Sequence, residues 1–172
     1  NWLYDWEDSC SSEYFQPETR EELKIAVDEW IADKDEANST YGHISTWDTS
    51  LITDMSELFY YNQTFNDDIS NWDVSSVTTT EKMFKFAEDF NQDLSGWDVS
   101  NVFHMSDMFN NSGFSDENKC EIQTSFSTNE HWPYDWSESC NLKINTDLNV
   151  PDIFSLHQNY PNPFNPKTTI NY

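Results

Sequence analysis

The sequence predicts an α/β repeat protein, a leucine-rich-repeat-like solenoid of about three 25-residue turns with an N-terminal capping helix and a C-terminal cap. Three observations predict it. A Trp-Asp pair recurs every 25 residues, two hydrophobic patterns alternate within each period, and an amphipathic helix precedes the first copy. A fixed period of roughly 20–50 residues is typical of units that bury their apolar faces only against their neighbours. The predicted architecture therefore puts function on a surface rather than in a catalytic pocket.

Residues 17–33 are expected to form the N-terminal capping helix. Thr19 and Glu22 have the spacing of a capping box, and Pro17 suits the start of a helix. The apolar residues that follow recur at helical spacing, and they are Leu23, Ala26, Val27, Trp30 and Ile31. Their single stripe can cover the open end of a repeat array, which would otherwise expose its core.

The repeats span residues 44–115, and each unit combines two local patterns. The alternation seen at Trp72 and Val74 predicts a short strand with the intervening aspartate facing outward. A capping threonine followed by apolar residues at helical spacing, as over 53–59, predicts a short helix. The aromatic residues at equivalent positions are expected to form the repeat core, and they are Trp47, Trp72, Trp97, Phe59, Phe84 and Phe109.

Residues 116–140 are expected to form the C-terminal cap, and they include two cysteines. In an exported protein Cys120 and Cys140 are candidates for a disulfide, which would add roughly 3 kcal/mol by the chain-entropy estimate. Residues 1–10 resemble residues 131–140 at an offset of 130, so we interpret 1–10 as the tail of a preceding module and 11–140 as one repeat module. The partner of Cys10 would then lie upstream; a free buried thiol is the alternative.

The last part of the chain differs in character from the repeats. Residues 141–152 are polar without periodicity and are predicted to be a linker. Residues 153–172 contain three prolines within six positions, which exclude a helix there.

Composition excludes several classes of function. The chain has 32 acidic and 8 basic residues, a formal net charge of −24, so nucleic acid and anionic membranes are disfavoured partners. No run of 18 apolar residues is present, and membrane insertion is not expected. The histidines form no metal motif, and the sequence contains no nucleophile motif or phosphate-binding glycine loop. We therefore expect neither an enzyme nor a cofactor.

The repeated aspartates Asp48, Asp73 and Asp98 allow two interpretations. Each is followed two residues later by serine, which favours an Asx-type turn in which the carboxylate accepts backbone N–H groups. The alternative is a ladder of calcium sites, because hard cations take several carboxylate and carbonyl oxygens. The sequence has no EF-hand loop that would support the calcium alternative.

The aromatic residues also allow two interpretations. The tryptophan and methionine columns fit a buried core better than a carbohydrate platform or cofactor box. Trp132, Tyr134 and Trp136 alternate along an extended segment and are expected to pack on the end of the repeats or on the next module, with sugar stacking as the alternative.

The repeated Trp-Asp-Val-Ser-x-Val-Thr segment, the Met-Phe pair and the intervening Phe-Asn-x-Asp segment resemble the BspA-like bacterial surface repeat family, which is related to leucine-rich repeats. The resemblance covers about residues 15–140. Thr80 and Phe103 depart from it, since methionine and threonine would be usual there. The resemblance implies a secreted or cell-surface protein of adhesion or interaction type.

Residues 156–172 resemble the opening of the sorting domain that the bacterial type IX secretion system reads, in a shortened form. The resemblance implies contact with the secretion machinery and an extracellular or outer-surface location. The residues that would carry this signal are Asn159, Tyr160, Pro161, Asn162, Pro163, Phe164, Asn165 and Pro166.

The expected function is therefore a secreted or cell-surface adhesion or interaction module that binds a protein or glycan through its repeat surface. One alternative is a structural subunit of an extracellular fibre or surface layer, in which tandem modules bind copies of themselves. The other is a non-catalytic accessory region of a larger exported enzyme.

Overall fold

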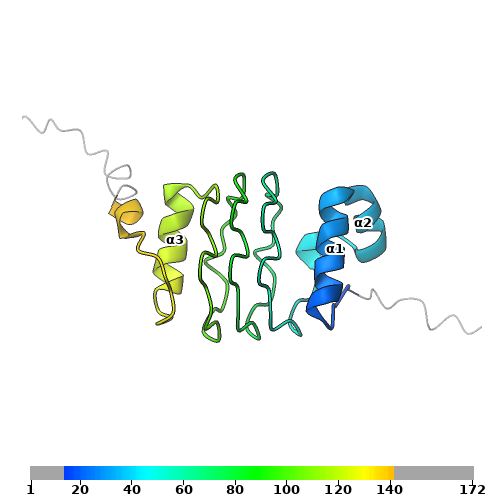
Figure 1. Cartoon of the computed structure of the whole chain (residues 1–172), viewed down its shortest axis with the longest axis horizontal. Coiled ribbons are helices and arrows are strands. Elements are labelled where there is room, and N and C mark those ends of the chain that lie inside the picture. The colour runs from blue at the N-terminus through cyan, green and yellow to red at the C-terminus, as the bar shows by residue number, and fades with distance from the viewer. Residues whose placement is uncertain (1–13, 142–172) are drawn as a thin grey trace, which may run out of the picture.

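The computed structural model describes residues 14–141, and in it a row of repeat units lies between two helical ends (Figure 1). The predicted module tail over 1–10 with Cys10, the linker beyond Asn141 and the sorting signal lie outside the described residues. Helices are the regular secondary structure of the described part. They are α1 (Arg20–Ala32), α2 (Lys34–Tyr41), the 3-10 helix η1 (Ile44–Thr46) and α3 (Asp116–Phe126), and residues 137–141 are also helical.

Helix α1 forms where the capping box and the apolar stripe occur in the sequence. The Thr19 side chain accepts a hydrogen bond from the Glu22 N–H at 3.2 Å, and the Glu22 carboxylate accepts one from the Glu18 N–H at 2.8 Å. The stripe is fully enclosed at Leu23, Ala26, Val27 and Trp30. Asp33 ends α1 and caps α2 through the N–H groups of its first turn, so the two helices form one end of the molecule.

The predicted α/β leucine-rich-repeat-like solenoid is wrong. Residues 14–141 contain no strand and no sheet, and the β-bridges between repeat units in this part are isolated ones, from Asp54 to Thr79 and from Thr79 to His104. The short helix predicted over 53–59 is also wrong. Glu57 has a φ of 56°, which ends any helical or extended run at that point, and Lys82 and Asp107 repeat it at 54° and 57°. Turns therefore replace the predicted short helix, and the backbone from Trp72 to Val74 has no regular secondary structure.

Backbone hydrogen bonds nevertheless join each unit to the next. Those along residues 55–61 and 80–86 form a ladder that runs in one direction, whereas a few others run the opposite way, such as the Thr78 N–H to the Thr53 carbonyl at 2.8 Å. The N–H groups of residues 55, 57, 59 and 61 donate to the carbonyls of 79, 81, 83 and 85 at 2.9–3.0 Å. Those of residues 80, 82, 84 and 86 donate to 104, 106, 108 and 110 at 2.8–2.9 Å. The first unit therefore presents carbonyls toward the N-terminal end, and the last unit presents N–H groups toward the C-terminal end.

Both ends of this ladder are capped by side chains. At the N-terminal end Arg20 Nη2 donates to the Ser56 carbonyl at 2.6 Å. At the C-terminal end the Phe109 N–H donates to the Tyr134 hydroxyl at 2.9 Å, and burial raises the pKa of Tyr134 to about 12. Capping satisfies groups that an open edge would offer to another chain.

Candidate interaction surface

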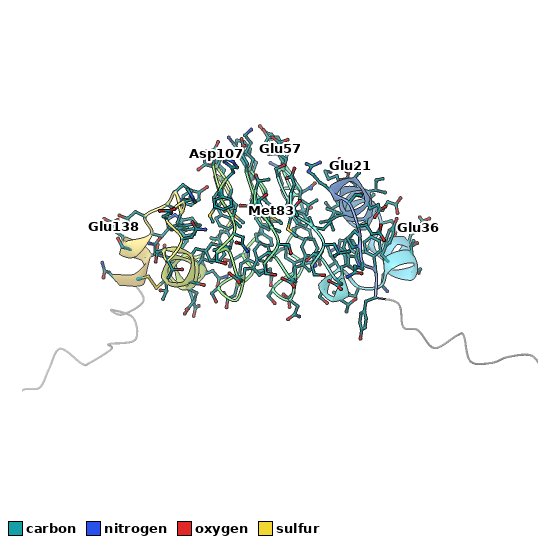
Figure 2. All side chains as sticks on the ribbon, turned by 90° about the horizontal axis from the view of Figure 1, so that it is seen from below. Glu21, Glu36, Glu57, Met83, Asp107 and Glu138 are labelled. Atoms are coloured by element: carbon teal, nitrogen blue, oxygen red, sulfur yellow. A yellow bond between two sulfur atoms is a disulfide. The ribbon has the colours of Figure 1, made fainter. Side chains whose placement is uncertain are left out.

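One edge of the repeat region carries side chains that are exposed or half-buried, and it is called the ridge here. These side chains are Glu57, Tyr60, Tyr61, Lys82, Lys85, Phe86, Asp107, Asn110 and Asn111. Figure 2 shows Glu57 and Asp107 at the outer border of the side chains, while Met83 lies toward the interior. The backbone of the ridge is held by the unit-to-unit ladder, in which the Tyr61 N–H donates to Lys85 at 3.0 Å and the Phe86 N–H to Asn110 at 2.9 Å. Side chains on the ridge thus project from a fixed backbone.

The ridge carries an aromatic cluster. Tyr61 is 57% exposed, and its ring stacks on the Phe86 ring with centroids 4.5 Å apart and planes 16° apart. The Tyr60 ring meets Tyr61 edge-on, also at 4.5 Å. Tyr61, Phe86 and their third equivalent, Asn111, all adopt positive φ, between 57° and 63°. Aromatic side chains rarely occupy this region, so the surrounding structure imposes it.

Two lysines neutralise part of the acidic surface around this cluster. Lys85 Nζ lies 2.7 Å from the Asp107 carboxylate and 5.7 Å from the Phe86 ring centroid. Lys82 lies between Glu81 and Glu57, at 3.1 and 3.3 Å, and hydrogen bonds to these two carboxylates raise the pKa of Lys82. The ridge therefore combines exposed rings with both signs of charge.

The six residues predicted as repeat core lie inside the molecule, away from the ridge. All are at most 4% exposed. The Trp47 and Trp72 rings stack at 6.1 Å, and the phenyl rings of consecutive units stack at 5.3 Å (Phe59 on Phe84) and 5.7 Å (Phe84 on Phe109). The Trp72 indole donates to the Ile44 carbonyl at 2.8 Å, so its polar atom is satisfied within the core. These rings are packed and present no face to a ligand.

The aspartate columns form Asx turns. The Asp48, Asp73 and Asp98 carboxylates each accept the N–H of the serine two residues later, at 2.9–3.0 Å. Serine hydrogen bonds lower the pKa of Asp48 and Asp98. Within residues 14–141 no group of three or more His, Cys, Asp or Glu side chains is arranged to hold a metal ion.

The C-terminal aromatic residues pack on the last repeat unit. Trp136 lies 5.7 Å from the Phe109 ring, and Trp132 and Tyr134 lie 6.1 Å from it. The structure joins Cys120 of α3 to Cys140 by a disulfide, which ties the end of this segment back to α3. The predicted sorting signal, residues 159–166, lies outside the described residues.

The sequence pattern did not predict the ridge, because the helix expected over 53–59 ends before Tyr60 and Tyr61 and because the prediction used only the apolar columns. A signal was present in the 25-residue alignment. Tyr61, Phe86 and Asn111 fall in one column, and asparagine is the residue among these that most readily adopts positive φ.

The comparisons with known proteins identify a family but no characterised relative. Neither the curated proteins nor the solved structures gave a significant match. None of the helices described combines the length and the apolar composition needed to cross a bilayer. The family that matches covers residues 29–146, more than half of the sequence. The chain belongs to the family described as "Mycoplasma protein of unknown function, DUF285".

Proposed function

We propose that this protein is a secreted or cell-surface adhesion or interaction module, without catalytic activity of its own, that binds a protein or glycan ligand through the surface of its repeat units. The observation that carries the proposal is the aromatic cluster of the ridge, where Tyr61 remains 57% exposed although its backbone is held rigidly. An exposed ring on a fixed backbone loses little conformational entropy when a partner covers it.

The composition of the ridge favours a protein partner there. Tyrosine is enriched among the residues that dominate protein–protein binding energy, and such residues occur in small clusters surrounded by polar groups. On the ridge, Tyr60, Tyr61 and Phe86 form the cluster, and Lys82 and Lys85 with their carboxylate partners form the polar surroundings. The strongly negative net charge favours a basic or neutral partner over an acidic one.

The proposed location rests on the two finer resemblances of the sequence. Surface repeats of BspA-like type and a shortened type IX sorting signal both belong to exported bacterial proteins. A disulfide between Cys120 and Cys140 is consistent with this location, because disulfides persist in oxidising compartments. Labelling of intact cells with an antibody against the chain would test it, and a signal only after permeabilisation would contradict it.

The fibre alternative has less support in the form in which the repeat units of neighbouring copies contact each other directly. Arg20 and Tyr134 occupy ladder groups at the two ends, and α1 and α3 lie over the first and last units (Figure 1). A fibre would therefore have to form between caps rather than by continuation of the ladder.

The binding proposal is tested with the full chain on a panel of immobilised extracellular-matrix proteins and cell-surface glycoproteins. The informative variant is Tyr61→Asn with Phe86→Asn, because Asn111 already occupies the equivalent position at the same positive φ. The variant should remain folded, with only a modest loss of stability, and weaken binding to a protein ligand at least tenfold, about 1.4 kcal/mol. Unchanged binding would refute the role of the ridge, and absence of any ligand among proteins and glycans would count against the function itself.

A further inference from the structure

A second surface departs from the repeat pattern at Phe103. Phe103 is 55% exposed, and the equivalent residues of the two preceding units are Thr53 and Thr78. The Thr78 hydroxyl donates to the Thr53 carbonyl at 3.1 Å and so helps to join two units. A phenyl ring cannot make this bond, and here it adds apolar surface to a strongly acidic exterior. More than half of Phe103 stays exposed, so the phenylalanine adds little packing to the fold. This points to a role for Phe103 other than stabilising the repeats.

Phe103 forms one wall of a shallow pocket of about 340 Å³ at the C-terminal end of the repeats. This volume lies near the lower end of the roughly 300–1,000 Å³ that small-molecule sites occupy. The His131 ring stands edge-on to Phe103, with centroids 5.5 Å apart and planes 68° apart. The remaining walls are all polar, and they come from Ser100, Thr128, Asn129 and Glu130.

The polar walls are held in place by Asn129. Its side-chain amide donates to the carbonyls of Val99 at 2.7 Å and Val102 at 2.9 Å, which ties this loop to the last repeat unit. Its Oδ1 accepts the His131 N–H at 2.7 Å. The pocket is therefore organised before any ligand arrives, and binding does not have to order the loop.

The chemistry of the walls selects the class of ligand. The Ser100 and Thr128 hydroxyls and the His131 imidazole can each donate and accept hydrogen bonds, whereas the Glu130 carboxylate, with its side chain 88% exposed, accepts only. A cation would need acceptors alone. A polyhydroxylated ring has hydroxyls that both donate and accept, and C–H faces that can cover a phenyl ring.

We infer that this pocket binds one sugar residue of a glycan, with the ring of the sugar on Phe103 and its hydroxyls on Glu130 and His131. The inference rests on the proposed function and deepens it, since it gives the module a glycan site separate from the ridge. Phe103 supplies the apolar contact, and the loop held by Asn129 supplies the hydrogen bonds.

The experiment probes the full chain on an array of defined mono- and oligosaccharides, followed by titration calorimetry with each saccharide that binds. Phe103→Thr restores the residue of the two preceding units and should keep the fold while weakening saccharide binding at least tenfold. Glu130→Gln keeps the shape but removes the charge, and a loss of about threefold or more is expected. The matched control is Leu51→Thr, which removes another exposed apolar side chain, 51% exposed, and should leave binding unchanged.

The outcomes separate this inference from the proposed function. The inference is supported if Phe103→Thr weakens saccharide binding. Binding should stay intact in Leu51→Thr and in the ridge variant, Tyr61→Asn with Phe86→Asn. No saccharide bound, or binding unaffected by Phe103→Thr, overturns it, while a protein ligand captured through the ridge would still stand. Binding of a Lys/Arg-rich peptide in place of saccharides, weakened by Phe103→Thr and by salt, also overturns it, because the pocket would then be a cation site.

Discussion

Thr80 provides a sharp test of how the core is built. It stands in the column of Met55 and Met105, is 1% exposed, and its hydroxyl has no hydrogen-bond partner among the described residues. Removing an unsatisfied buried hydroxyl recovers a desolvation penalty of about 1–3 kcal/mol. Thr80→Val removes the hydroxyl and keeps the branched shape, so we expect the free energy of unfolding to rise by about 1 kcal/mol.

Thr49 is the matched control, because it is equally buried but satisfied. Its hydroxyl donates to the Asp73 carbonyl at 2.9 Å, so Thr49→Val should lower the free energy of unfolding by about 1 kcal/mol. The two substitutions should therefore change the free energy of unfolding in opposite directions, so that the variants differ by about 2 kcal/mol. Urea unfolding followed by tryptophan fluorescence measures both, since the chain has 8 tryptophans. Destabilisation of both variants would refute the reasoning, because it would mean that the Thr80 hydroxyl is satisfied.

Three further predictions follow from close contacts, the disulfide and the Asx turns. A Cβ added at Gly113 would lie 2.1 Å from a backbone oxygen of the preceding unit, whereas a Cβ added at Gly96 would meet nothing within 4 Å. Gly113→Ala should therefore lower the free energy of unfolding by at least about 2 kcal/mol, and Gly96→Ala by less than about 0.5 kcal/mol. Thermal unfolding measures both. Replacing Cys120 and Cys140 together by alanine should lower the free energy of unfolding by about 2–4 kcal/mol. A reductant should lower the melting temperature of the wild type and leave that of the variant unchanged. A wild-type melting temperature that does not respond to reductant would contradict this prediction. The folded-state pKa of Asp98 lies below its ordinary 3.8, so the stability that Asp98 adds is full above that pH and is lost as pH falls through the folded pKa. The difference between the wild type and Asp98→Ala should shrink on acidification in unfolding curves from pH 6 to 2.5, and a difference that grows would be inconsistent with it.

The parts of the fold that sequence reasoning located are those with a strong periodic or chemical signal. The helix expected over 17–33 forms as α1 over the shorter range Arg20–Ala32, because a capping threonine and a helical stripe both mark it. The tryptophan and phenylalanine columns are buried because a 25-residue spacing brings large apolar rings onto one another in every unit. Burial follows from the pattern of apolar residues without requiring a particular backbone conformation.

The backbone of the repeats could not be predicted in the same way. Alternation at Trp72 and Val74 is compatible with a strand, but a backbone without regular secondary structure also buries both side chains and exposes the aspartate between them. The positive φ values at Glu57, Lys82 and Phe86 run against the intrinsic preference of those residues. They are imposed by hydrogen bonds to a neighbouring unit, and such contacts leave no local signal in the sequence.

The candidate site was missed for a related reason. Ridge residues were grouped by their sequence pattern, and the exposure of Tyr61 depends on which side of a turn its ring occupies. Phe103 was noticed only as a departure from the usual residue. Its pocket depends on the loop over 128–131, which the sequence does not place near it.

The central claim is that the buried rings build the scaffold and the neighbouring exposed rings serve for binding. Phe84 and Phe86 lie in the same repeat unit, one fully buried and the other partly exposed on the ridge. The most direct test measures both unfolding and ligand binding for Phe84→Ala and Phe86→Asn. We predict that Phe84→Ala costs about 3–5 kcal/mol, whereas Phe86→Asn costs less than about 1.5 kcal/mol and weakens binding at least tenfold. A Phe86→Asn variant that unfolds as readily as Phe84→Ala, or that binds as tightly as the wild type, would contradict the account.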